Sequence, residues 1–241
     1  MIISKILSKW SLDPYYQSSS VLDSILLAYR QFFSLDNECI IKHANCRICC
    51  PKRLNKNQSS DYIIKISAEA SDWSRTIYQL AHEISHVVME CYPDRESLKW
   101  ISECLCEAAS FYTLDKLSKM WQKEPHNLPC AISLEEYLEN KINKIEKVPL
   151  LADFYSKNAQ WLADDPYADE GTERPRNDVF ALSFYDIIQQ NTLGWTAITH
   201  MSDEQLPDNA NTVDYLNHWE KKCIKTSEKE FVLTLKKSLG L

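Results

Sequence analysis

The sequence predicts an α+β fold that is mainly helical, and three observations support this prediction. Only three glycines occur in 241 residues, so few positions can adopt the backbone conformation that tight β-hairpin turns require. Apolar residues make up 44% of the chain, enough for a sizeable core, and they recur at helical spacing in most segments. Two short β-branched segments, 38–44 and 61–67, precede the longest helical patterns. Strands followed by a run of helices are typical of an α+β arrangement.

The N-terminal part is predicted to contain one helix and then these two strands. Residues 18–34 repeat apolar side chains at helical spacing, and Ser18–Ser20 offer an N-cap. The polar loop between the strands carries an H-x-x-C-x-x-C-C run. A structural zinc site needs a second, separated half, which would have to come from Cys39, Cys130 or Cys223. We therefore interpret the run as a strand and loop with ordinary thiols (His43, Cys46, Cys49, Cys50).

Helices are predicted for most of the remaining chain. The first begins at Ser71 or Asp72, buries a stripe of apolar residues and ends at Pro93 and Asp94. A second long helix follows over roughly residues 95–121. Further helical patterns occur at 134–145, 150–163, 177–192, 209–220 and 227–239.

Charge and cysteine usage restrict the classes of function. The net charge of −7 argues against a broad nucleic-acid surface, which requires clustered lysine and arginine. No apolar stretch approaches the length of a membrane span. The nine cysteines are odd in number, and no secretory signal pattern precedes them. We therefore expect reduced thiols, a cytoplasmic location, and neither nucleic acid nor membrane as partner.

The stretch YQLAHEISHVVMEC, residues 78–91, contains the motif His-Glu-x-x-His. On a helix, His82 and His86 lie about 40° apart around the axis and one turn apart along it, so both imidazoles face one cation. Neutral imidazole nitrogen is a ligand that suits Zn²⁺. Glu83 lies roughly 100° from His82, where its carboxylate can act as general base on a zinc-activated water. The motif therefore predicts a catalytic zinc site.

A catalytic zinc needs a third protein ligand, which the next helix offers in KWISECLCEAASFY, residues 99–112. Glu103 and Glu107 are four residues apart on one face, and small residues follow them, so this helix can approach the first one closely. Either glutamate can complete the set, although helix glutamates are often simply solvated. Cys104 and Cys106 are interpreted as buried core residues and not as a nucleophile.

The two segments together resemble the gluzincin metallopeptidases, in which HExxH is followed by a helix similar to W-L-S/N-E-G-x-A-E. The matching residues here begin at Trp100. The resemblance implies a zincin-like domain, with His82, His86 and Glu103 as Zn²⁺ ligands and Glu83 as base. It also implies that Glu107 orients a ligand histidine.

A weaker similarity extends to residues 177–201, the downstream helix of these families. There a tyrosine shortly before the helix stabilises the oxyanion, and Arg176 occupies that place here. Tyr185 is a substitute, as are Tyr167 and His200. The implied function is that of a zinc metallopeptidase acting on a peptide or protein substrate. The alternative is a degenerate gluzincin that binds zinc but serves as a binding or regulatory module.

The same reasoning predicts three parts of the chain. Residues 1–162 form the zincin-like catalytic domain, with the N-terminal helix and the short strands. Residues 163–177 are polar and acidic and contain prolines, which is typical of a linker or loop. Residues 178–241 form a helical C-terminal subdomain that completes the cleft.

Overall fold

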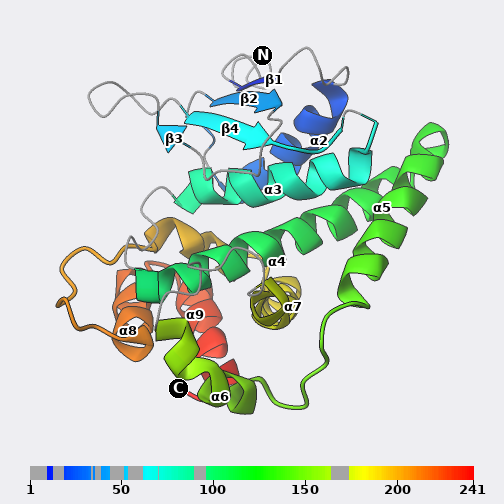
Figure 1. Cartoon of the computed structure of the whole chain (residues 1–241). Coiled ribbons are helices and arrows are strands. Elements are labelled where there is room, and N and C mark those ends of the chain that lie inside the picture. The colour runs from blue at the N-terminus through cyan, green and yellow to red at the C-terminus, as the bar shows by residue number, and fades with distance from the viewer. Residues whose placement is uncertain are drawn as a thin grey trace. The chain divides into compact units, whose positions relative to one another are not determined.

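The computed structural model describes residues 10–12, 19–33, 35, 39–43, 52–53, 62–69, 71–89, 96–163 and 174–241. This part of the chain is mainly helical, which confirms the prediction (Figure 1). The chain forms two compact units. The first consists of Met1–Val88 and Ser110–Asn140, and the second consists of Met89–Ala109 and Lys141–Leu241.

A small sheet belongs to the first unit. Its four strands have the order β1-β2-β4-β3, in which the first three are parallel to one another and β3 is antiparallel to β4. Two strands, β2 and β4, fall within the predicted segments. The other two were not predicted, because two or three residues are too few to show an alternating pattern. The bounds are β1 (Trp10–Leu12), β2 (Cys39–His43), β3 (Lys52–Arg53) and β4 (Tyr62–Ile66).

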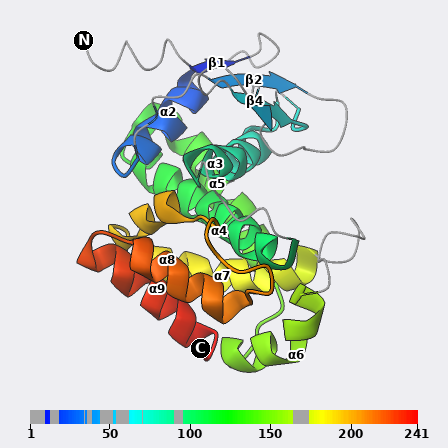
Figure 2. The same ribbon diagram turned by 90° about the vertical axis from the view of Figure 1, so that its left-hand side faces the viewer.

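Helices lie along one face of this sheet. In β4 the side chains of Tyr62, Ile64 and Ile66 are buried and alternate with half-buried ones, as a strand covered on one face requires. Figures 1 and 2 show α2 (Ser19–Arg30) and α3 (Trp73–Met89) on the covered side. The sheet therefore gives α3 a fixed support.

Side-chain hydrogen bonds hold α3 in place at several points. Asp72 Oδ1 accepts from the Arg75 backbone N–H at 3.1 Å, which confirms Asp72 as the predicted N-cap. Tyr29 of α2 donates its hydroxyl to the carbonyl oxygen of Ala81 at 2.9 Å and also lies 2.9 Å from Ser85 Oγ. The contacts of Tyr29 are buried, whereas the Asp72 cap is exposed. Hydrogen bonds therefore hold α3 both at its start and along its middle turns.

The long helix α4 (Glu96–Trp121) confirms the helix predicted at 95–121. Within the first unit, Ser110 Oγ donates to the Tyr78 carbonyl of α3 at 3.0 Å. Ser118 Oγ donates in the same way to Ala131 of α5 (Leu128–Ile142), also at 3.0 Å. A short 3₁₀ turn, η1 (Pro125–Asn127), connects α4 and α5. The start of α5 precedes the predicted residue 134, because a proline in the first turn of a helix loses no hydrogen bond.

The described part of the second unit contains the start of α4 and four later helices. Trp100 of α4 packs on Phe180 with ring centroids 5.0 Å apart, and Trp219 Nε1 donates to the Ala197 carbonyl at 2.8 Å. The later helices match the predicted segments within a few residues, whereas the 3₁₀ segment η2 was not predicted. The bounds are α6 (Leu151–Ala163), α7 (Arg174–Gln190), η2 (Gly194–His200), α8 (Thr212–Lys222) and α9 (Thr226–Ser238).

A buried carboxylate, Glu228, joins η2 to the start of α9. Its side chain is 2% exposed; it accepts from Thr196 Oγ1 at 2.7 Å and from the backbone N–H groups of Ile224 and Lys225 at 3.1 and 3.0 Å. His200 Nε2 lies 3.3 Å from it. Burial by itself raises the pKa of Glu228, but the hydrogen bonds from Lys225, Thr196 and Ile224 outweigh it and lower this pKa from 4.5 to about 2.

Replacing Glu228 with glutamine is expected to lower the free energy of unfolding at pH 7 by about 2 kcal/mol, because charged hydrogen-bond acceptors are lost. Since the folded pKa is depressed, this stabilisation is fully present above pH 4.5 and falls as the pH drops toward 2. Urea unfolding of both proteins at pH 7, 4 and 3 checks this. A difference between the two proteins that stays constant over these pH values would contradict the assigned cause.

Some sequence predictions lie outside the described residues. These are Cys46, Cys49 and Cys50 of the cysteine run, the helix end at Pro93 and Asp94, Tyr167, and residues 164–173 of the expected linker. Of the described cysteines, Cys39, Cys104, Cys130 and Cys223 are free thiols. In the part of the chain that is described, no helix has the length and apolar character needed to cross a membrane.

Candidate metal centre

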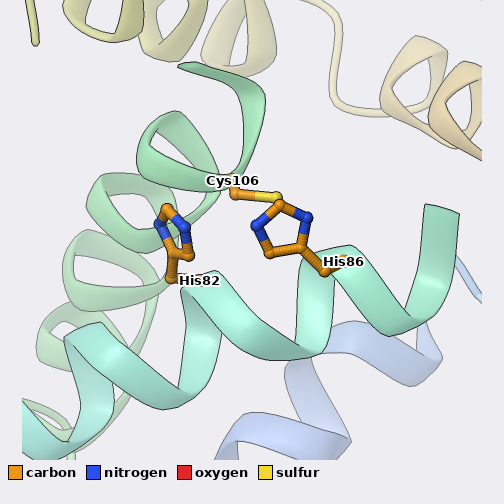
Figure 3. Close-up of side chains that lie close together, drawn as sticks. All are labelled: His82, His86 and Cys106. Atoms are coloured by element: carbon orange, nitrogen blue, oxygen red, sulfur yellow. The ribbon is translucent and has the colours of Figure 1, made fainter. Parts of the chain in front are cut away.

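The two histidines of the motif lie side by side on α3. Their ring centroids are 5.1 Å apart and their ring planes differ by 65°. His86 is 2% exposed, whereas His82 is half-buried. Figure 3 shows both rings projecting from the same side of the helix. The arrangement expected from four-residue spacing is therefore present.

Glu83 directly follows His82 in the sequence and is 3% exposed. It lies one helical turn after Gln79, so the two side chains share a stripe of α3. Gln79 Oε1 accepts from the backbone N–H groups of Ser67 and Ala68, directly after β4, at 3.0 and 2.9 Å. The face of α3 that carries Gln79 and Glu83 is therefore hydrogen-bonded, through Gln79, to the residues that follow β4.

A different stripe of α3 carries the hydrogen bonds that brace the helix. Ser85 Oγ donates to the Ala81 carbonyl at 2.8 Å, and both residues contact the Tyr29 hydroxyl. Because Ser85 is roughly 100° from His86 around the axis, these bonds fix the helix without using the histidine face. The two imidazoles thus project from a segment whose position is set by buried contacts.

Cys106 of α4 joins the two histidines in one group (Figure 3). Its Sγ and one ring nitrogen of each histidine all lie within 4.8 Å of one another. Around one tetrahedral Zn²⁺, with bonds of about 2.0–2.3 Å, ligand atoms are roughly 3.5 Å apart. Imidazole nitrogen and thiolate sulfur are both established zinc ligands, so the donor set fits this metal.

The other predicted site residues do not belong to this group. Glu103 and Glu107 are half-buried residues of α4. Tyr185 is a buried residue of α7, where its hydroxyl accepts from Gln189 Nε2. Arg176 is exposed in the first turn of α7. Their roles as third ligand, histidine-orienting acid and oxyanion donors remain predictions. His200, considered as a substitute oxyanion donor, lies beside Glu228.

The two cysteines of α4 differ in their surroundings. Cys104 is fully buried, and its thiol donates to the Asn177 carbonyl at 3.5 Å. Burial, with a smaller contribution from the Glu103 carboxylate, raises the pKa of this thiol well above its ordinary value. Cys104 is thus the core residue that the sequence predicted. Cys106 is equally buried but lies beside the histidines, a position that the sequence interpretation missed.

A signal for Cys106 was nevertheless present in the sequence. It lies three residues after Glu103 and four before Ser110, so these residues share one face of α4. A rotation of α4 that turns Glu103 toward the histidines also turns Cys106 toward them.

In comparisons with protein-family models, with curated proteins and with solved structures, nothing matches this chain. The resemblance to gluzincins therefore depends on the motif residues alone.

Proposed function

We propose that the protein is a zinc-dependent hydrolase, specifically a metallopeptidase with a zincin-like site, in which His82 and His86 bind the metal. The observation that carries this proposal is the pair of imidazoles with ring centroids 5.1 Å apart on one face of α3. The buried Glu83, which directly follows His82 in the sequence, supports it. A metal ligand pair with an adjacent base is the combination that metal-assisted hydrolysis requires.

Zinc, when bound, supplies the Lewis acidity that lowers the pKa of a water molecule to about 7. In this proposal the Glu83 carboxylate accepts the proton of the attacking water and later delivers it to the leaving amine. Because Glu83 is 3% exposed, bulk water competes little for its oxygens. The role of His82 and His86 is to hold the metal with neutral ring nitrogens.

The remaining roles are proposed from the sequence. A residue of α4 supplies the third ligand, for which the motif names Glu103, and Glu107 orients one of the histidines. Tyr185 or Arg176 donates to the oxyanion that develops on the substrate carbonyl. The proposed substrate is a peptide or a protein.

The proposal is tested by metal removal and readdition. The full chain is stripped with a chelator, reloaded with zinc and incubated with a peptide library made from a digested proteome. New peptide termini, measured by mass spectrometry, are expected only in the zinc-loaded sample. They should disappear when the chelator is added again and return when excess zinc is supplied.

Two other outcomes have distinct meanings. Tight zinc binding without new termini would contradict the peptidase assignment and support a zinc-containing binding or regulatory module. Cleavage that persists after the metal has been removed would contradict the metal-dependent mechanism itself.

A further inference from the structure

We infer that Cys106, and not Glu103, is the third protein ligand, so that the metal is held by two imidazoles and one thiolate. The inference rests on the proposed function for the presence of a metal, but not for its hydrolytic activity. The observation behind it is the group formed by His82, His86 and Cys106, whose ligand atoms lie within 4.8 Å of one another (Figure 3).

One hydrogen bond between α3 and α4 lies within the first unit. Ser110 Oγ donates to the Tyr78 carbonyl at 3.0 Å, and this fixes one turn of α4 against one turn of α3. His82 lies one turn after Tyr78 on α3, and Cys106 lies one turn before Ser110 on α4. Among the described residues, Cys106 is the residue of α4 that shares a group of possible metal ligands with His82 and His86.

Burial and chemistry both favour a ligand role for this thiol. Cys106 is 0% exposed and His86 is 2% exposed, so bulk water competes little for either side chain. Soft thiolate sulfur favours zinc, cobalt and cadmium, whereas carboxylate oxygen suits magnesium and manganese. Two imidazoles and one thiolate also leave a fourth tetrahedral position open, as a catalytic zinc site requires.

The sequence supplies a matched control for Cys106. Cys104 lies two residues away on the same helix and is equally buried, but its Sγ donates to the Asn177 carbonyl instead. Replacing either cysteine with serine removes a buried sulfur from α4. Only the Cys106→Ser change is expected to remove a metal ligand.

Cobalt spectroscopy tests the inference without any substrate. The chelator-stripped full chain is titrated with Co²⁺, and the near-ultraviolet band that reports sulfur-to-cobalt charge transfer is recorded. The band should appear in the wild type and in Cys104→Ser, and should be absent from Cys106→Ser. Loss of even an outer-shell partner weakens metal affinity by about 10–100-fold, so Cys106→Ser should weaken Co²⁺ binding by at least about tenfold.

X-ray absorption at the zinc edge of the wild-type protein provides a reading that does not depend on whether a variant folds. One sulfur neighbour at about 2.3 Å is expected together with nitrogen neighbours. A shell of nitrogen and oxygen only would overturn the inference, as would a cobalt band that survives Cys106→Ser or is lost in Cys104→Ser. The proposed hydrolase would survive those results. Conversely, a metal bound by a thiolate in a protein that cleaves no peptide would support Cys106 as a ligand and contradict the proposed hydrolase activity.

Discussion

Replacing Glu83 with glutamine is expected to lower the peptide-cleavage turnover number by about 10²–10⁴-fold, the usual contribution of a general base. Glutamine has nearly the same shape as glutamate but cannot accept a proton from water at neutral pH. Because the side chain is 3% exposed, an isosteric change disturbs the packing of α3 least. The measurement is the rate of cleavage of a peptide identified from the library, at saturating substrate.

Two controls accompany this variant. Zinc content should equal that of the wild type, since His82 and His86 are unchanged. Glu139→Gln, an exposed position on α5, should retain full turnover. If Glu83→Gln cleaves the peptide at the wild-type rate with its metal bound, Glu83 is not the base and another proton acceptor has to be sought.

Replacing His86 with alanine is expected to abolish the stabilisation that zinc gives to the folded chain. A ligand present at 1,000 times its Kd stabilises the folded state by about 4 kcal/mol. For a chain of 150–250 residues, each kcal/mol corresponds to roughly 2–4 °C in Tm, so zinc should raise the Tm of the wild type by about 8–16 °C. In His86→Ala the addition of zinc should leave the Tm nearly unchanged. Differential scanning fluorimetry with and without zinc measures both shifts.

A matched control distinguishes metal binding from packing. His86 is 2% exposed, so the alanine variant also loses some packing and should melt lower than the wild type even without metal. His126 is exposed, and its Nε2 lies 3.7 Å from Glu124 Oε2. His126→Ala should therefore keep the full zinc-dependent shift. Equal loss of Tm in His86→Ala with and without zinc would mean that His86 contributes packing alone.

Much of the helical structure was predictable because its signals are local. The apolar stripe that starts at Ile77 and the cap at Asp72 define the start of α3, and the hydrogen bond from Arg75 to Asp72 confirms that cap. Strands β1 and β3 were not predictable, because their few residues gain stability only by pairing with β2 and β4. That pairing joins segments far apart in the sequence.

In the candidate site too, features set within one helix were predictable, whereas features that depend on contacts between helices were not. The spacing of His82 and His86 alone predicts their common face, which a single helix determines. Which residue of α4 lies near the histidines depends on the rotation of that helix about its own axis. The Ser110–Tyr78 hydrogen bond, which restrains this rotation, cannot be predicted from the sequence. A cysteine in an apolar helix is usually a core residue, so Cys106 was given the same interpretation as Cys104.

The most direct test of the central claim is the metal content of the purified chain. Native mass spectrometry with elemental analysis should find one zinc ion per wild-type chain, and none in a His82→Ala/His86→Ala double variant that still shows its helical circular dichroism. A folded wild-type chain that binds no divalent metal when zinc is supplied, or a double variant that retains one ion per chain, would contradict the claim that these two imidazoles form a metal site.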